Sequence, residues 1–335
     1  MRKIFILFVF LTQSLLYAKT VTDKLIVWPS PPQKARIQYT GSLTKTTDIG
    51  IKKGFFSKVF NFVLGEDEKR LVKPFGIDVT DEKIIVTDTA QKALYIFDKK
   101  NNRLKIVDSF NNIIFSSPID VATDERGYIY VSDSVLGKVF VFDDNAEYKF
   151  QIGVSTNLKR PTGIAINDRL NRIYVSDSLA GNIKVFTLDG LYIKTIGKQG
   201  SNNAEFNKPT FLTIGKNDNL YISDSMNQRI QVLDQDGKFI FKFGQLGRSG
   251  GTFSNPRGIA LDEDDNIYVT DTLFNSVQIF NQKGELLLIF GEFGENEGEF
   301  SIPEDIFITP KGEIYVVDSY NMRVQMFEHL HSIDE

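Results

Sequence analysis

The chain has 335 residues and a formal net charge of −4, a length that a single all-β domain can use. It contains no cysteine, which excludes disulfide bonds, thiolate metal sites and a cysteine nucleophile. Its acidic balance argues against nucleic acid as a partner, because proteins that bind nucleic acid carry a basic excess.

Residues 1–18 have the pattern of a secretory signal peptide. Arg2 and Lys3 precede an apolar run over residues 4–11, and Ala18 stands at the expected cleavage point. We therefore predict an exported protein, periplasmic or extracellular, whose charge after cleavage falls from −4 to −6. An uncleaved anchor is the alternative, although the apolar run is short for a transmembrane helix. The mature chain has no other candidate transmembrane span.

Three segments follow before the main body of the chain. Residues 19–34 are a Pro-rich lead-in, and residues 35–43 alternate between polar and apolar side chains as a strand does. Residues 50–71 contain an amphipathic pattern that predicts a short helix or linker. This helix either packs against the rest of the protein or makes peripheral contact with a membrane or partner through residues 51–64.

From residue 74 onward the chain repeats itself. A strand-like run ends in Asp followed by Ser or Thr six times, at intervals of 44 to 47 residues. These six aspartates are Asp88, Asp133, Asp177, Asp224, Asp271 and Asp318. A proline lies 14 to 16 residues ahead of each of them. We predict that each Asp accepts hydrogen bonds from backbone N–H groups of the next turn.

Each repeat contains four short runs with the period of two that is typical of strands. Asp-Gly pairs such as Asp189-Gly190 and Asp236-Gly237 supply the glycine that tight hairpin turns need. Four antiparallel strands in each repeat of this length describe a propeller blade. The sequence therefore predicts an all-β, six-bladed β-propeller over residues 74–335. Its blades start near residues 74, 118, 161, 209, 256 and 303.

The sixth repeat has only three strand-like runs, so one outer strand is missing. An open blade edge would invite aggregation. We predict that residues 35–43 supply this outer strand, pair with residues 323–328 and close the ring.

The repeats resemble a known family. The segment Tyr221 to Val232 reads Tyr-x-x-Asp-Ser-x-Asn-x-Arg-Ile-Gln-Val, and Tyr315 to Met326 repeats it with small changes. This pattern is similar to the NHL repeat, and the resemblance covers roughly residues 74–328. It implies a propeller but no particular function, because such propellers do unrelated work. The RNA binding of some NHL domains conflicts with export and with the acidic charge.

No catalytic group or cofactor is predicted. The two histidines, His329 and His331, are expected in a tail after the last strand. The acidic run from Asp262 to Asp265 lacks the glycine and the bidentate Glu of a calcium-binding EF-hand loop. We interpret it as a solvated turn and predict no metal site.

The residues beside the repeated prolines differ between blades and are expected near the mouth of the central channel. The predicted binding residues are Phe75, Asp120, Arg160, Thr162, Phe211, Arg257, Glu304 and Asp305, with Lys73, Ile119, Lys208 and Thr210 at neighbouring positions. Our leading hypothesis is a binding scaffold for a protein or peptide partner. The alternative is a calcium-dependent hydrolase or lyase, with Asp120, Glu304 and Asp305 as the first ligands to test. Unselected surface variation would also explain the differences.

Overall fold

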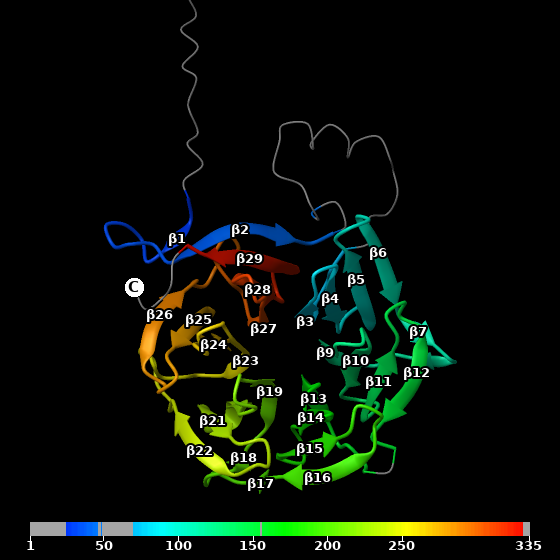
Figure 1. The fold of residues 1–335 in the computed structure, drawn as a ribbon. Coiled ribbons are helices and arrows are strands. Elements are labelled where there is room, and N and C mark those ends of the chain that lie inside the picture. The colour runs from blue at the N-terminus through cyan, green and yellow to red at the C-terminus, as the bar shows by residue number, and fades with distance from the viewer. Residues whose placement is uncertain (1–24, 46–47, 49–69, 155, 331–335) are drawn as a thin grey trace, which may run out of the picture.

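The computed structural model describes residues 25–45, 48, 70–154 and 156–330 (Figure 1). The predicted signal peptide and residues 50–69 of the predicted helix lie outside this range, so both stay predictions. Within the described residues, no helix is long and apolar enough to cross a membrane.

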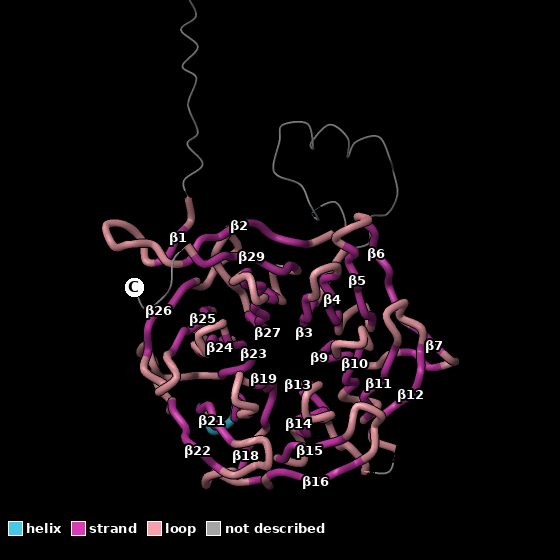
Figure 2. The backbone as a smooth tube through the Cα atoms, viewed as in Figure 1, coloured by secondary structure: helices cyan, strands magenta, loops and turns pink. Residues whose placement is uncertain are grey.

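Six four-stranded antiparallel blades form a ring, as the repeats predict (Figures 1 and 2). Blade 1 contains β3 (Pro74–Val79), β4 (Lys83–Asp88), β5 (Ala93–Asp98) and β6 (Arg103–Val107). Blade 2 contains β9 (Pro118–Thr123), β10 (Ile129–Asp133), β11 (Lys138–Phe142) and β12 (Tyr148–Ile152). Blade 3 contains β13 (Pro161–Asn167), β14 (Arg172–Asp177), β15 (Asn182–Phe186) and β16 (Tyr192–Ile196).

Blade 4 contains β19 (Pro209–Ile214), β20 (Leu220–Asp224), β21 (Arg229–Leu233) and β22 (Phe239–Phe243). Blade 5 contains β23 (Pro256–Leu261), β24 (Ile267–Asp271), β25 (Ser276–Phe280) and β26 (Leu286–Phe290). Blade 6 contains β27 (Pro303–Ile308), β28 (Glu313–Asp318), β29 (Arg323–His329) and β2 (Ile37–Leu43). Short pieces complete the list: β1 (Val27–Trp28), β7 (Ser109–Phe110), β8 (Ile113–Ile114), β17 (Lys198–Gln199), β18 (Glu205–Phe206) and the 3-10 turn η2 (Ser225–Asn227).

The N-terminal strand closes the ring, which confirms the predicted pairing. Strand β2 lies antiparallel to β29, with Ile37 opposite His329 and Leu43 opposite Val324. Ile37 and Leu43 are buried at the two ends of the strand. Strand β1 then pairs with β2 and covers its outer edge. The two ends of the propeller are thereby joined within one sheet.

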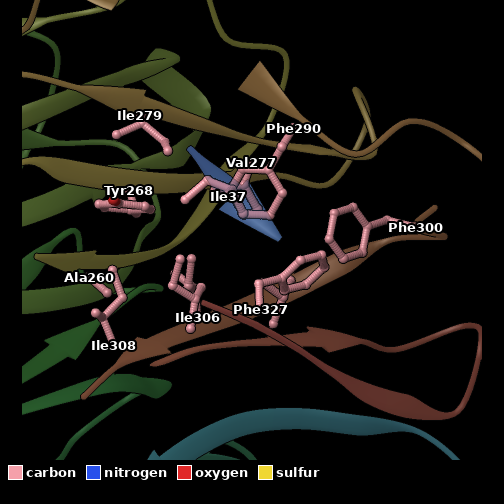
Figure 3. Packing of buried hydrophobic residues seen from close by; sticks show 12 residues of the cluster. Ile37, Ala260, Tyr268, Val277, Ile279, Phe290, Phe300, Ile306, Ile308 and Phe327 are labelled. Carbon is pink, nitrogen blue, oxygen red and sulfur yellow. The ribbon is translucent and has the colours of Figure 1, made fainter. Parts of the chain in front are cut away.

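The hydrophobic core lies between neighbouring blades. Figure 3 shows the cluster between blades 5 and 6, where Ile37 of the closing strand meets Phe290, Phe300 and Phe327. Trp28 of β1 packs on this cluster, with its ring centroid 5.7 Å from that of Phe290. Burial of such large apolar side chains is the main favourable contribution to folding.

A buried hydroxyl joins each of several blades to the next. Thr87 Oγ1 accepts a hydrogen bond from the Gly76 N–H and donates to the Ile119 carbonyl of blade 2, both at 2.8 Å. Ser132 and Thr270 donate in the same way to blades 3 and 6, at 2.6 and 3.1 Å. These hydroxyls fix the spacing of the innermost strands, because each satisfies a buried carbonyl of the neighbouring blade.

The residue two positions after each repeated proline alternates between small and large around the ring. In chain order these residues are Gly76, Asp120, Gly163, Phe211, Gly258 and Asp305. The glycines allow close approach of neighbouring inner strands. A Cβ on Gly76 would lie 2.5 Å from the Ile119 carbonyl oxygen, and one on Gly258 would lie 2.6 Å from Asp305 Cα. A side chain therefore does not fit at these glycine positions, and the larger residues stand in the alternate blades.

The six repeated aspartates are fully buried and tie loops together. Asp88 Oδ1 accepts from the N–H groups of Ala90 and Gln91 in the following turn, at 3.0 and 2.9 Å. This confirms the predicted capping role in four blades, for Asp88, Asp133, Asp177 and Asp271. Asp88 Oδ2 also accepts from the N–H groups of Val72 and Lys73, 2.7 and 2.9 Å away, before the proline. That second set of bonds was not predicted, because it joins segments far apart in sequence.

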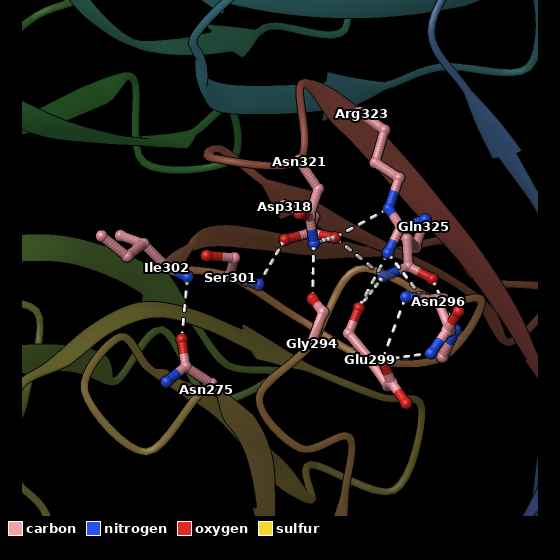
Figure 4. A network of polar contacts seen from close by, with 11 residues as sticks. Asn275, Gly294, Asn296, Glu299, Ser301, Ile302, Asp318, Asn321, Arg323 and Gln325 are labelled. Atoms are coloured by element: carbon pink, nitrogen blue, oxygen red, sulfur yellow. Dashed lines mark hydrogen bonds and ion pairs between the residues drawn. The ribbon is translucent and has the colours of Figure 1, made fainter.

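The prediction was wrong for blades 4 and 6, where an arginine network takes the place of this turn capping; Figure 4 shows it for blade 6. Asp318 Oδ2 accepts from Arg323 Nε at 2.8 Å, Asn321 Nδ2 at 2.8 Å and Gln325 Nε2 at 3.0 Å. Arg323 also donates to the Glu299 carbonyl at 2.9 Å. The Asp-Ser-x-Asn-x-Arg-x-Gln spacing thus brings together a buried Asp–Arg ion pair and the side chains that hydrogen-bond to it.

The structure corrects the expectation for His329, which is the last residue of β29 and not part of a tail. Its Nε2 lies 2.6 Å from the Tyr268 hydroxyl. In blades 2 and 3 the equivalent hydroxyls, of Tyr130 and Tyr174, bond to a hairpin-turn carbonyl of the next blade. Blade 6 has no hairpin turn there, because its outer strand comes from the N-terminus, and His329 takes its place. Burial lowers the pKa of His329.

Candidate binding site at the channel mouth

One face of the ring carries the starts of the inner strands and the turns that follow the repeated aspartates. The two lie together because each proline pairs with the Asp of its own blade, as Pro256 does with Asp271. A cavity of about 420 Å³ opens at the centre of this face, which we call the channel mouth. That volume is within the usual range of ligand pockets. Its lining residues are Lys73, Phe75, Thr89, Ser117, Ile119, Arg160, Thr162, Ser178, Lys208, Thr210, Phe211, Ser225, Met226, Asn255, Arg257 and Glu304.

Six of the eight residues predicted for binding line this mouth: Phe75, Arg160, Thr162, Phe211, Arg257 and Glu304. The other two, Asp120 and Asp305, line a separate cavity of about 230 Å³ in the channel. Phe211 borders both cavities. The sequence placed all eight at one level, whereas successive residues of an inner strand point in different directions.

Two aromatic rings and an ion pair form a fixed wall of the mouth. Phe75 and Phe211 stack across the ring with centroids 6.2 Å apart. The Arg257 guanidinium lies 5.6 Å from the Phe75 centroid, and its Nη1 is 3.2 Å from Glu304 Oε2. Burial raises the pKa of Glu304, and the charge of Arg257 opposes that rise. Arg257 is therefore held by both an aromatic face and a carboxylate.

Three further cations surround the mouth and are exposed: Lys73, Arg160 and Lys208. None of them forms an ion pair with another described residue. Lys73 Nζ instead lies 5.8 Å from the ring centroid of Tyr320. With Arg257, the lining holds four basic side chains against the single acid Glu304. A chain of net charge −4 thus presents a locally positive cavity, which attracts anionic groups.

The channel below the mouth contains buried carboxyl groups. Burial raises the pKa of Asp120 to about 8 and that of Asp78 to about 6. Asp120 Oδ2 accepts from the Ile164 N–H of blade 3 at 2.7 Å, and Asp305 Oδ2 accepts from the Ile77 N–H of blade 1 at 3.0 Å. Their oxygens serve as links between inner strands.

These links do not fit the calcium site of the alternative hypothesis. Among the described residues, no three His, Cys, Asp or Glu side chains are grouped as ligands of a metal ion. Glu304 is at the mouth beside Arg257, while Asp120 and Asp305 are in the channel. A hard cation needs several oxygen ligands around one point.

Sequence reasoning missed several lining residues, among them Ser178, Met226 and Asn255. They stand within two residues of a repeated Asp or proline, and their place in the repeat suggested a purely structural role for them. The signal that could have found them is the pairing of each proline with its closing Asp, which brings the turn after the Asp to the mouth.

The fold and its central mouth define a six-bladed β-propeller with a cationic pocket at the entrance of the channel. A family model described as a 6-bladed beta-propeller matches residues 155–240, and the NHL repeat model matches residues 253–280 and 300–327. The chain is therefore a six-bladed β-propeller that contains NHL repeats within residues 253–280 and 300–327.

Solved structures share this fold at low sequence identity. Virginiamycin B lyase from Staphylococcus aureus is 15% identical with a TM-score of 0.57, covering 77% of this chain and 95% of that one. An auxiliary nutrient binding protein from Bacteroides ovatus is 14% identical with a TM-score of 0.62, covering 88% and 78%. A chain of a nidogen/laminin complex is 18% identical with a TM-score of 0.53, covering 76% and 92%. No curated protein matches the chain.

Proposed function

We propose that this chain is an exported binding propeller that holds a protein or peptide partner at the channel mouth. The observation that carries the proposal is the mouth itself, where residues that break the repeat gather into one positive cavity. The repeat leaves the positions beside each proline free to vary. In four different blades a basic residue at such a position lines the mouth: Lys73, Arg160, Lys208 and Arg257. Repulsion between these positive charges lowers the stability of the folded protein, so binding of an anionic ligand that neutralises them is favourable.

Two of the similar structures bear names that refer to binding or to a complex: the auxiliary nutrient binding protein and the nidogen/laminin complex. They support a binding role for this chain only as examples of what the fold can do. The stacked pair Phe75 and Phe211 adds an apolar wall, so the pocket suits a ligand that combines an anionic group with apolar surface.

The test is a crosslinked pull-down with residues 19–335 against cell-envelope extract from the same cells. The double variant Arg160→Glu/Lys208→Glu reverses two exposed charges at the mouth, and we expect it to lose the partner. Lys100→Glu is the matched control, because Lys100 is exposed in a turn between β5 and β6 and does not line the mouth. A partner captured equally by all three proteins would refute the proposed site.

Export is tested separately. N-terminal sequencing of the protein from the envelope fraction should begin at Lys19 if the signal is cleaved as we expect. A chain that starts at Met1 and remains in the cytoplasm would refute this part of the proposal.

A further inference from the structure

The turns around the mouth share an unusual feature. The residue two positions after each closing Asp is apolar in all six blades, and we call these residues the apolar collar: Ala90, Val135, Leu179, Met226, Leu273 and Tyr320. Each of them is exposed. Among the five large ones, the exposed fraction runs from 44% at Met226 to 68% at Val135. The collar surrounds the cationic pocket described above, and Met226 belongs to both.

The fold does not require apolar side chains at these positions. Collar residues take part in these turns through the backbone N–H. The Val135 N–H donates to Asp133 Oδ1 at 3.1 Å, and the Leu273 N–H donates to Asp271 Oδ1 at 3.2 Å. Turns ordinarily favour polar residues. The turns between the first and second strands of each blade, at the opposite face, follow that preference with exposed residues such as Asp81, Glu125 and Lys311. Exposed apolar side chains that gather on one face of a protein are typical of interaction surfaces.

Two more apolar side chains extend the collar outward over blades 4 to 6. Leu246 and Phe293 are 70% and 74% exposed, in the loops that lead into β23 and β27. Asn321 Nδ2 donates to the Gly294 carbonyl at 2.9 Å, which fastens the loop of Phe293 to the collar turn of blade 6 (Figure 4). This hydrogen bond holds the loop of Phe293 against the collar turn of blade 6.

We infer that the collar docks a protein partner whose acidic segment enters the cationic mouth, an inference that rests on the proposed function. Charge complementarity selects this occupant, because three exposed cations that form no ion pair with another described residue line the cavity inside the collar. A flat bilayer would reach the collar but not the half-buried Arg257. In addition, Glu292 and Glu295 are exposed beside Phe293 and would repel anionic lipid.

The experiment measures fluorescence anisotropy with three synthetic peptides of equal length. One combines glutamate with leucine, one has serine in place of leucine, and one has lysine in place of glutamate. The collar variant is Leu179→Ser/Met226→Ser/Leu273→Ser, and the mouth variant is Arg160→Glu/Lys208→Glu. A rim variant, Leu191→Ser/Ile240→Ser, is the matched control, since both residues are exposed but belong to the outer part of blades 3 and 4.

We expect the glutamate–leucine peptide to bind best, and the collar variant to weaken it at least about tenfold, as the loss of one well-buried apolar anchor does. The collar variant should leave the glutamate–serine peptide unchanged, whereas the mouth variant should weaken both acidic peptides. The rim variant should behave as wild type. Thermal melting should be unchanged in the collar and rim variants, because every residue substituted in them is exposed, and the mouth variant should remain folded.

Equal binding of the glutamate–leucine peptide by the collar variant would overturn the inference, while a mouth variant that still weakens binding would leave the proposed function standing. A mouth variant without effect would instead overturn the proposed function. Preference for the lysine–leucine peptide, or no binding of any peptide, would overturn both. Collar-dependent sedimentation with phosphatidylglycerol vesicles would assign the collar to a membrane. A collar-dependent dimer in light scattering would assign it to a second copy of the chain.

Discussion

A disulfide placed across the ring closure should stabilise this propeller more than one placed within a blade. Gln38 of β2 lies opposite Glu328 of β29, and both side chains are accessible. The chain has no native cysteine, so Gln38→Cys/Glu328→Cys can form only one intramolecular bond. That bond closes a loop of about 290 residues, for which the chain-entropy relation gives about 5.7 kcal/mol at 25 °C.

The matched control is Lys184→Cys/Thr195→Cys, which joins β15 and β16 of blade 3 at another directly opposed pair. Its loop of about 12 residues gives about 2.8 kcal/mol by the same relation. For a domain of this size these values correspond to increases in Tm of about 9 and 5 °C.

The assay compares oxidised and reduced protein by calorimetry, so each variant serves as its own reference for the substituted side chains. We expect the closure disulfide to raise Tm by clearly more than the blade disulfide. Equal increases would refute the reasoning, because they would mean that β2 remains paired with β29 in the unfolded ensemble or is already detached before the main transition.

Three further predictions concern buried polar groups. Arg323→Met should lower the free energy of unfolding by about 3–5 kcal/mol in urea denaturation, because it leaves Asp318 buried without its countercharge; a loss below about 1 kcal/mol would contradict the buried ion pair. The pKa of Asp120 is raised from 3.8 to about 8, so its contribution to stability is complete below about pH 4 and is lost as the pH rises towards 8. Asp120→Asn should therefore flatten the fall in Tm between pH 5 and 8.5, and an unchanged slope would speak against this residue. Burial lowers the pKa of His329 below its usual 6.5, so stability should fall as the pH drops below about 6.5, and a His329→Gln variant should lose less Tm between pH 7 and 5 than the wild type does.

Most of the fold could be predicted from the repeated sequence pattern. Pro74, Asp88 and their counterparts recur at one period, and each repeat unit folds into the same four strands because its hydrogen bonds and turns are local. The closing strand was also predictable, because the sixth repeat lacked one strand and residues 35–43 had the right alternation. His329 was misplaced because its partner, Tyr268, comes from another blade.

The amino-acid sequence was enough to predict the number of blades, their boundaries, the closing strand and ten of the residues that line the mouth. The contacts between side chains of different blades could not be predicted in this way, because they depend on the folded ring. The separation of Asp120 and Asp305 from the mouth, the Phe75–Phe211 stack and the positive cavity all depend on contacts across the ring. A repeat pattern specifies what each blade is, whereas the channel is formed by one strand from every blade, and its chemistry exists only after the ring has closed.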